Sequence, residues 1–305
     1  MKTVVVTGGA GFIGSHIADA YADRGWRVVV IDNLTTGDRG NVNPRAELHV
    51  ADVRDAAAII AKVRPDLISH HAAQVDVRKS VADPAEDAEI NVVGSLRLLQ
   101  AAVDARVKRF IFASSGGAIY GEPVSAPQTE EHMLRPMSPY GCAKLAVEQY
   151  MNYYREVQGL STVALRYANV YGPRQSSRGE AGVVAIFAGR MVRGEPVTIN
   201  GRGDQTRDFV YVGDIVAANM AVSERDDLRG AFNVGTGVET SINELYDAMA
   251  RLTGTSARAE HAPAKAGEQL RSVLDGAKLR KQAGLAGPMA ISDGLPETID
   301  FFRRR

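Results

Sequence analysis

We predict an α/β fold in which a doubly wound parallel sheet is followed by a smaller C-terminal lobe. Short β-branched runs repeat along the first half of the chain, and segments of helical periodicity separate them. The runs lie at 3–8, 27–32, 47–52, 67–72 and 109–115, and the helical segments lie at 15–24, 56–63 and 91–105. Apolar strands that alternate with helices are typical of right-handed crossovers with both sheet faces covered, so we expect a sheet of the Rossmann type.

The remaining elements follow from the same periodicities. A helix is expected to begin near Tyr140, with another strand at 161–172. The polar, glycine-rich stretch 172–182 then marks the boundary between a first domain at 1–172 and a second region at 173–305. We expect the second region to form the smaller lobe and to cross back to the first domain. Its predicted strands lie at 195–200, 207–212 and 230–235, and its predicted helices lie at 183–193, 214–224, 241–253 and 292–303.

Composition narrows the function. The 305 residues suffice for one large domain or two closely packed ones, and 36 Lys and Arg balance 36 Asp and Glu. Without excess positive charge we expect neither nucleic acid nor membrane as a partner. The single cysteine, Cys142, cannot form an internal disulfide, and no stretch is apolar enough for a signal peptide or a membrane span. We therefore expect a cytoplasmic protein.

A glycine-rich turn at the N-terminus indicates a dinucleotide site. Gly8, Gly11 and Gly14 lie between the first strand and an apolar helix. Such glycines permit a tight turn, a close approach to a pyrophosphate and close packing of helix on strand, while the helix N-terminus offers amide donors. An ordinary turn is the alternative, and the position between strand and helix favours the dinucleotide site.

An acidic residue indicates which dinucleotide binds. Asp32 ends the second strand, where a carboxylate accepts hydrogen bonds from ribose hydroxyls and repels a 2′-phosphate. No Arg or Lys lies within 32–37, so NAD is favoured over NADP. A helix or turn cap is the alternative role for Asp32. Asp52 and Val53, at the end of the third strand, are candidates for the adenine edge, with an N-cap at Asp52 as the alternative.

Tyr140 and Lys144 are the candidate catalytic pair. Residues four apart share one face of a helix, and Ser138 followed by Pro139 is typical of a helix start. An ammonium beside the phenol, together with a positive nicotinamide, stabilises phenolate and makes Tyr140 a base near neutrality. A solvated surface pair is the alternative, which the glycine-rich turn disfavours.

With these motifs the chain resembles an extended short-chain dehydrogenase/reductase of the NAD-dependent epimerase/dehydratase family. Over essentially its whole length it is most similar to the nucleotide-sugar branch represented by UDP-glucose 4-epimerase. The motifs that carry the resemblance are TGGAGFIG (7–14), DNLTTG (32–37), HHAAQ (70–74), NVVGS (91–95), SSGGAIYG (114–121), SPYGCAK (138–144), RYANVYGPRQ (166–175), EAGVVAIF (180–187) and RDFVYVGD (207–214).

The resemblance implies two sets of binding residues, no metal, and a homodimer formed through helices 91–105 and 140–157. The residues implied for NAD are Gly8, Gly11, Phe12, Ile13, Gly14, Asp32, Asn33, Thr35, Thr36, Gly37, Asp52, Val53, Ala72, Ala73, Gln74, Asn91, Ser114, Tyr140, Lys144 and Tyr167. Those implied for the UDP-sugar are Ser115, Tyr140, Asn169, Val183, Val184, Thr198, Ile199, Asn200, Arg207, Lys265, Arg271 and Ser272. For Arg207, a surface ion pair with Asp208 is the alternative to a phosphate contact.

The chain departs from the family pattern at the strand end 114–121. Many members have a Ser or Thr where this chain has Gly116, so Ser114, Ser115 or a water must polarise the sugar hydroxyl, and we favour Ser115 as the third catalytic residue. The segment also lacks the carboxylates of the related dehydratases and decarboxylases. Five places after Gly267, the family's epimerases have a bulky residue beside the sugar 2-substituent, and this chain has Ser272, which leaves room for an N-acetyl group.

We therefore expect an NAD-dependent epimerase that inverts C4 of UDP-glucose and UDP-galactose, and of their N-acetyl forms, through a 4-keto intermediate. Three alternatives remain open: epimerisation of another nucleotide sugar such as UDP-glucuronate, a net reductase or dehydrogenase, and a catalytically inactive dinucleotide sensor. His70 and His71 are adjacent on a strand end and point to opposite sides, so we expect packing roles and no metal site.

Overall fold

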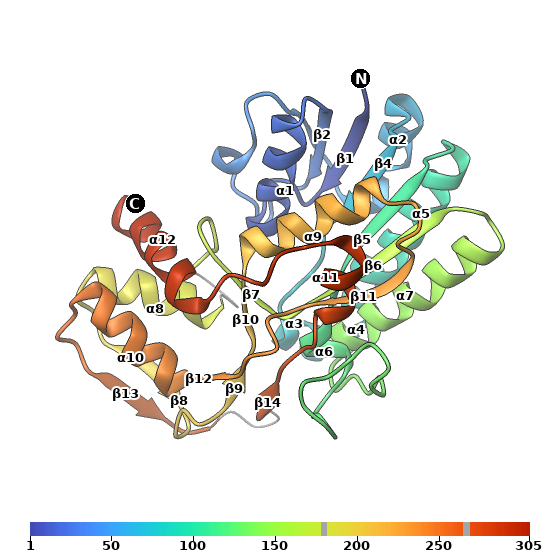
Figure 1. Cartoon of the computed structure of the whole chain (residues 1–305). Helices are drawn as coiled ribbons and strands as arrows, with labels where there is room; N and C mark the ends of the chain where they lie inside the picture. The colour runs from blue at the N-terminus through green and yellow to red at the C-terminus, as the bar shows by residue number, and fades with distance from the viewer. Residues whose placement is uncertain (178–181, 265–268) are drawn as a thin grey trace.

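A parallel sheet forms the centre of the protein (Figure 1). The computed structural model describes residues 1–177, 182–264 and 269–305, and within them this sheet has seven strands in the order β11-β6-β5-β4-β1-β2-β3. Every neighbouring pair is parallel, which confirms the doubly wound fold. The strands are β1 (Thr3–Thr7), β2 (Arg27–Asp32), β3 (Glu47–Val50), β4 (Leu67–His70), β5 (Arg109–Ser115), β6 (Ser161–Tyr167) and β11 (Gly230–Val234).

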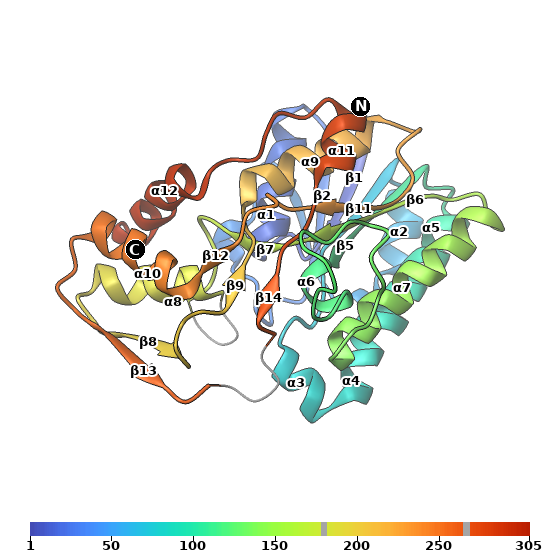
Figure 2. The ribbon, with the colours of Figure 1, turned by 60° about the horizontal axis from the view of Figure 1, so that its bottom comes forward.

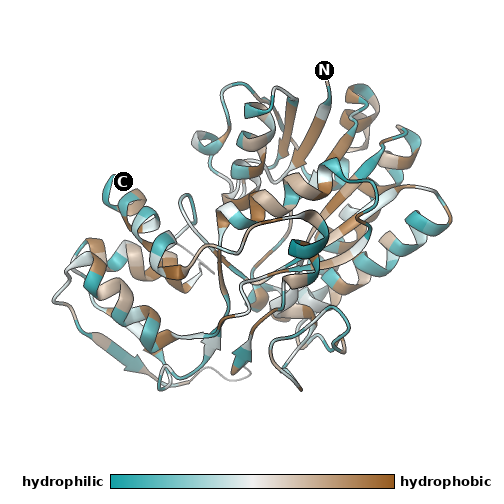
Figure 3. Ribbon diagram, viewed as in Figure 1, coloured by the Kyte–Doolittle hydropathy of each residue, from teal (hydrophilic) through white to brown (hydrophobic). Residues whose placement is uncertain are grey.

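Alternate residues of each strand enter different apolar layers. Val4 and Val6 pack in one cluster with helices α1, α9 and α11, whereas Val5 packs in the other with α2, α5 and α7. Figure 3 shows the strands of this sheet as predominantly hydrophobic. Burial on both faces explains why the strands lack the polar alternation of a half-exposed sheet. The covering helices are α1 (Phe12–Asp23), α2 (Ala57–Val63), α5 (Gly94–Asp104), α7 (Pro139–Glu156), α9 (Val212–Glu224) and α11 (Ala277–Ala283).

Two predicted elements of the first domain differ in extent. The helix expected at 91–105 begins at Pro84, because α4 (Pro84–Ala88) continues through the π-turn η3 (Glu89–Val93) into α5, and Asp83 caps its start. The strand expected at 161–172 is divided into β6 and β7 (Asn169–Tyr171), and β7 pairs with β10 (Phe209–Tyr211). Other short elements here are η1 (Arg39–Asn41), η2 (Val53–Asp55), α3 (Val77–Ala82) and α6 (Gly116–Ile119).

A smaller lobe lies beside the main sheet (Figure 2), and its elements share an apolar core of their own. Phe187, Leu245 and Leu295, from three different helices, are buried together in it. Its elements are α8 (Val183–Val192), β8 (Val197–Asn200), α10 (Ile242–Thr253), β13 (Ala259–Ala262) and α12 (Ile291–Arg303). The predicted helices at 183–193, 241–253 and 292–303 are therefore confirmed.

The chain returns from this lobe to the main sheet. The strand predicted at 230–235 for the smaller lobe belongs instead to the main sheet, where β11 pairs with β6, and α9 packs on α1. The strand predicted at 207–212 is also interrupted, because β9 (Thr206–Arg207) and β10 belong to different sheets. In one of these sheets, β9 lies between β12 (Thr240–Ser241) and β14 (Arg271–Ser272).

The buried side chain of Asp208 separates β9 from β10 and holds the C-terminal segment in place. Its carboxylate accepts hydrogen bonds from the backbone amides of Thr236, Gly237 and Leu274, and from the Thr236 hydroxyl. A buried carboxylate needs such donors, since it is taken out of water. The same residues therefore join the smaller lobe to the edge of the main sheet.

Within the described residues, none of the helices has the length and apolar character required to cross a membrane.

Candidate functional site

The site lies where the strand order reverses, between the carboxyl ends of β1 and β4. Gly8 has a φ of +69°, and a Cβ added there would lie 2.7 Å from the Ala72 backbone nitrogen. A Cβ on Gly14 would overlap the Gly8 carbonyl oxygen. Gly11 begins α1 without a side-chain cap, so the first amides of the helix remain available to an anion. The structure therefore requires glycine at the predicted turn and presents helix amides beside it.

Asp32 connects the glycine turn to the segment after β2. Its carboxylate accepts hydrogen bonds from the backbone amides of Ala10 at 3.0 Å and Leu34 at 2.8 Å. The turn-cap role given as an alternative is thus present, and the same carboxylate also lies against the dinucleotide turn. Gly37 approaches it closely, whereas Thr35 and Thr36 are exposed.

The third strand end shows the cap given as an alternative for Asp52. Asp52 accepts from the Arg54 amide and pairs with the Arg54 side chain at 2.9 Å, and it also accepts from Asn33. Val53 is buried in the core beside Gly94. Asn33 and Asp52 therefore meet at one edge of the predicted adenosine region.

The loop after β4 is held by amide side chains. Asn91 accepts from the Gln74 backbone amide and donates to the Gln74 carbonyl, both at 2.9 Å. Both side chains also donate to the buried carboxylate of Asp87, again at 2.9 Å. Ala72 and Ala73 thus lie in a fixed loop beside the glycine turn.

Tyr140 and Lys144 meet on the first turns of α7, which Ser138 caps as predicted by accepting from the Gly141 amide. The Lys144 Nζ atom lies 5.6 Å from the centroid of the Tyr140 ring and donates to the Ala113 carbonyl at 2.9 Å. Burial lowers the pKa of Lys144 to about 8, against the charges of Asp87 and Glu148. Burial, and then the charge of Asp87, raises the pKa of Tyr140. The protein groups alone therefore do not produce the lowered phenol pKa that the sequence suggested.

The structure distinguishes the two serines at the end of β5. Ser115 lies beside the phenol of Tyr140, and its hydroxyl lowers the pKa of that phenol against the larger effect of burial. Ser114 is buried, and its hydroxyl donates to Glu148 at 2.5 Å, which points it away from a ligand. A Cβ at Gly116 would overlap the Leu274 side chain, so Leu274 occupies the space that a family serine would need. Ser115 therefore remains the hydroxyl beside the predicted base.

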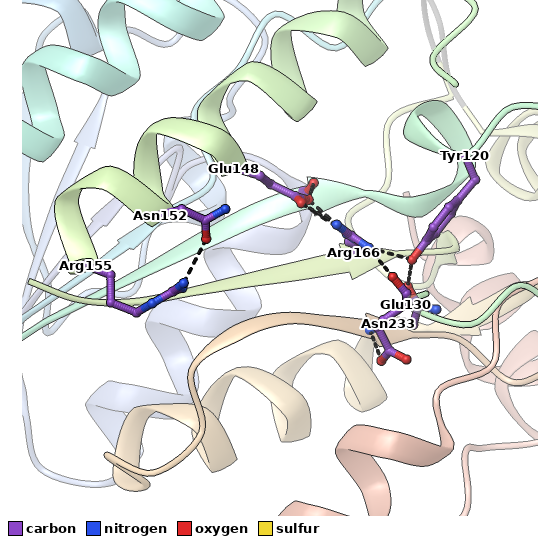
Figure 4. A network of polar contacts seen from close by, with 8 residues as sticks. Tyr120, Glu130, Glu148, Asn152, Arg155, Arg166 and Asn233 are labelled. Carbon is purple, nitrogen blue, oxygen red and sulfur yellow. Dashed lines mark hydrogen bonds and ion pairs between the residues drawn. The ribbon is translucent and has the colours of Figure 1, made fainter. Parts of the chain in front are cut away.

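A buried ion pair lies one turn beyond Lys144 on α7 (Figure 4). Arg166 on β6 donates from Nε and Nη2 to Glu148, and its Nη1 donates to the Tyr120 hydroxyl at 2.8 Å. Tyr120 in turn donates to Asn233 on β11, also at 2.8 Å. The network joins α7 to β6, β11 and the segment that follows α6.

The residues predicted to contact the diphosphate lie together. The backbone amide of Asn169 donates to the backbone carbonyl of Asp208 at 2.9 Å. Arg207 on β9 is the strand partner of Ser272 on β14. The ion pair between Arg207 and Asp208 is not formed, because the Asp208 carboxylate points toward Thr236 and Leu274. Ser272 is buried, with its hydroxyl 3.6 Å from the Cβ position of Gly117.

The other predicted substrate residues lie farther apart in the smaller lobe. Val184 and Ile199 are buried in its core, so only their backbone can meet a ligand, whereas Val183 and Asn200 are half-buried and Thr198 is exposed. Arg271 forms a bidentate ion pair with Glu239, in which Nε donates to Oε1 at 2.9 Å and Nη2 donates to Oε2 at 2.6 Å. Lys265 lies outside the described residues.

The two adjacent histidines pack within the protein. His70 bridges the hydroxyls of Thr7 and Ser95, and His71 stacks on Tyr167 with ring centroids 6.5 Å apart. Burial lowers the pKa of His71 to about 3 and that of His70 well below its usual value, so neither carries charge near neutrality. In the part of the chain that the structure describes, no group of His, Cys, Asp and Glu side chains is arranged for a metal ion.

Sequence reasoning missed two buried carboxylates beside the catalytic pair. Glu148 follows Lys144 by four residues, and Asp87 precedes Asn91 by four. For Glu148 the available signal was a charged residue on the buried face of a predicted helix, because such a charge requires a partner, whereas Asp87 precedes the helix predicted at 91–105 and gave no such signal. The partners, Arg166 for Glu148 and the amides of Gln74 and Asn91 for Asp87, become apparent only in the fold.

Known proteins are similar to this chain in sequence and in structure. A family model described as the NAD dependent epimerase/dehydratase family matches residues 4–235. A UDP-glucose 4-epimerase of Mycolicibacterium smegmatis is 41% identical over 312 residues, covering 100% of this chain and 99% of that protein. Solved structures of UDP-glucose 4-epimerase from Thermotoga maritima with UDP-glucose and from Thermus thermophilus with NAD match with TM-scores of 0.96 and 0.94. Each is 43% identical, and each comparison covers 99% of both chains.

We predict that Glu148→Gln lowers the free energy of unfolding by about 3–5 kcal/mol, because it leaves the Arg166 guanidinium buried without a counter-charge. Urea denaturation followed by circular dichroism measures the change. Glu156→Gln, which removes an exposed carboxylate from the same helix, is the matched control and should cost less than about 1 kcal/mol. Equal effects of the two substitutions would contradict a structural role for the buried pair.

Proposed function

Because the chain belongs to the NAD dependent epimerase/dehydratase family, we propose that it inverts C4 of a UDP-hexose, interconverting UDP-glucose and UDP-galactose. The observation that carries this proposal is the position of the Lys144 ammonium over the Tyr140 ring, with Ser115 beside the phenol and the glycine turn at the same edge of the parallel sheet. The three groups surround the position where a sugar hydroxyl would be oxidised. A binding protein without catalysis has no need of this arrangement.

The residues present fit NAD. An added Cβ would collide with the backbone of Ala72 at Gly8 and with the Gly8 carbonyl at Gly14, so the turn packs this tightly only with glycine, and it leaves the first amides of α1 free for a pyrophosphate. Asp32 lies beside the turn, where a ribose hydroxyl can donate to its carboxylate. When bound, NAD supplies the hydride acceptor for the sugar carbon and later returns the hydride to it.

The chain's own groups then move the proton. The Tyr140 phenol must lose its proton to act as base, and Lys144, whose ammonium lies over the ring, favours that loss electrostatically. The phenolate removes the proton from the 4-hydroxyl as a 4-keto sugar forms, and Ser115 orients that hydroxyl. The phenol then returns the proton after the sugar has presented its other face. Arg207 and Asn169, held together at β9 and β7, would retain the diphosphate meanwhile.

The alternative reactions differ from the proposed one in the groups or in the cofactor turnover that they need. The strand end 114–121 contains no carboxylate for elimination or decarboxylation. A net reductase or dehydrogenase would consume free NAD(H), whereas the proposed cycle restores its cofactor. A UDP-glucuronate substrate would require a cation for its carboxylate, and Arg271 is occupied by Glu239.

Ser272 favours a wider substrate range that includes the N-acetylhexosamines. Its side chain is small and lies across from Gly117, which has no side chain of its own. Room at this position would accept a substituent on C2 of the sugar. UDP-N-acetylglucosamine and UDP-N-acetylgalactosamine are therefore proposed as further substrates.

We also propose a homodimer in the cytoplasm. Tyr150 and Tyr153 on α7 form an exposed stripe with Val157, the C-cap of that helix, which is 66% exposed. Large apolar side chains spaced along one helix are typical of an interface between copies. The single unpaired Cys142 suits a reducing compartment.

We predict that the purified protein interconverts UDP-glucose and UDP-galactose without added NAD, and that Tyr140→Phe lowers kcat about 10²- to 10⁴-fold by removing the base. Chromatography of the products measures both. Glu156→Gln, at the exposed end of the same helix, should retain wild-type activity. Full activity of Tyr140→Phe, or net conversion of NAD to NADH, would refute the mechanism.

We predict that Ser115→Ala lowers kcat about 10²-fold in the same chromatographic assay, because it removes the hydroxyl that orients the sugar 4-hydroxyl. An unchanged kcat would assign this contact to a water molecule.

We predict that Ser272→Tyr lowers turnover of UDP-N-acetylglucosamine relative to UDP-glucose by about 10-fold or more, because the ring fills the space beside Gly117. Competition between the two substrates in one reaction measures the ratio. Ser272→Ala, which keeps the side chain small, should leave the ratio unchanged. An unaltered ratio in Ser272→Tyr would remove Ser272 as the determinant.

We predict a dimeric mass for the protein at micromolar concentration, measured by sedimentation equilibrium. Val157→Arg should shift the equilibrium toward monomer, because it places a charge in the apolar stripe. A monomeric mass for the wild-type protein would contradict the proposed dimer.

A further inference from the structure

Asp87 is a buried carboxylate whose hydrogen bonds are incomplete. It lies on α4 with 2% of its surface exposed, and Oδ1 accepts from the side-chain amides of Gln74 and Asn91. The other oxygen, Oδ2, is buried and has no hydrogen-bond partner among the described residues. A buried charged oxygen without a donor is costly, so its position requires a reason beyond local structure.

The reason lies on the neighbouring helix. α4 packs against α7, and Figures 1 and 2 both place α3 and α4 beside α7. The charge of Asp87 acts on both Lys144 and Tyr140. The catalytic pair therefore faces a negative group that belongs to a different element from its own helix.

The other charged groups around Lys144 are neutral or already paired. Glu148, one turn away, is bound by Arg166 through three hydrogen bonds. His70 and His71, which also face Lys144, are uncharged near neutrality. Asp87 forms no ion pair with an Arg or Lys side chain at short range in the described residues, so its charge is not cancelled locally.

We propose that Asp87 is a positioning residue of the reaction, whose unpartnered carboxylate oxygen is the counter-charge of the Lys144 ammonium and thereby sets the pH at which Tyr140 acts. This proposal rests on the epimerase function above. Asp87 touches neither the sugar nor the reacting atoms, and it acts through Lys144 and Tyr140.

The charge of Asp87 moves the pKa values of Lys144 and Tyr140 in the same direction. A negative neighbour favours protonated ammonium and disfavours phenolate, so the charge of Asp87 raises the pKa of Lys144 and of Tyr140 alike. Removing the charge lowers both pKa values. The acidic limb of kcat/KM, which follows loss of the phenol proton, and the alkaline limb, which follows loss of the ammonium proton, then both move to lower pH.

The test is the pH profile of kcat/KM for the Asp87→Asn holoenzyme. The amide keeps an oxygen for the Gln74 and Asn91 donors, and it replaces the unpartnered Oδ2 with an uncharged NH2 group of similar size. We expect both limbs to move down by about one pH unit. Glu86→Gln, which neutralises the exposed carboxylate one residue earlier, should leave both limbs in place. If Asp87→Asn does not fold, the neutral Asp87→Ser offers the same comparison.

A second readout does not depend on activity. In the cofactor-free protein, carbon-13 NMR of labelled Lys Cε atoms follows the titration of Lys144. The Lys144 signal is assigned as the one that is missing from the spectrum of Lys144→Met. The Lys144 midpoint should fall in Asp87→Asn. A pH profile that is scaled down without moving, together with an unchanged Lys144 midpoint, would overturn the proposal. A shifted midpoint in a protein without epimerase activity would keep the electrostatic role and reject only the proposed function.

Discussion

The buried ion pair between Glu148 and Arg166 determines where the reactive face of α7 points. Three hydrogen bonds from Arg166 and one from Ser114 satisfy a carboxylate that has left water, which is the condition under which a buried charge can persist. Because Lys144 precedes Glu148 by one helical turn, fixing the glutamate also fixes the ammonium and, one turn earlier, the phenol of Tyr140. Arg166 also donates to Tyr120, and Tyr120 donates to Asn233 on β11. The ion pair therefore fixes α7 relative to β6, β11 and the segment after α6.

The two halves of the candidate site achieve precision in different ways. Around the glycine turn, geometry comes from the backbone, since Gly8 and Gly14 leave no room for side chains and α1 presents its first amides. Around Tyr140, geometry comes from side chains that are buried, charged and mutually dependent. A backbone site tolerates changes in neighbouring side chains, whereas the charged site depends on each of Lys144, Glu148 and Asp87 keeping its protonation state.

Local sequence patterns were sufficient where neighbours along the chain determine structure. The strands of the main sheet, the start of α7 at Ser138 and Pro139, and the pairing of Tyr140 with Lys144 all follow from periodicity and capping. They were insufficient where distant residues meet. The partner of Arg271, the return of β11 to the main sheet and the contact of Leu274 with Gly116 join segments separated by tens to more than a hundred residues. A single sequence carries no periodic signal for such contacts, because they arise only when the tertiary structure forms.

The contact between Leu274 and Gly116 also limits the order in which this sequence can change over evolutionary time. A serine at 116 would require the Leu274 side chain to move or to be replaced by a smaller one, because its β-carbon and the present leucine rotamer would occupy the same volume. A smaller residue at 274, arising first, would open a cavity beside Ile119 and Tyr120 and weaken the protein. The two positions, one at the strand end of the catalytic site and the other near the C-terminus, are therefore sterically coupled, so the effect of a substitution at either depends on the residue at the other.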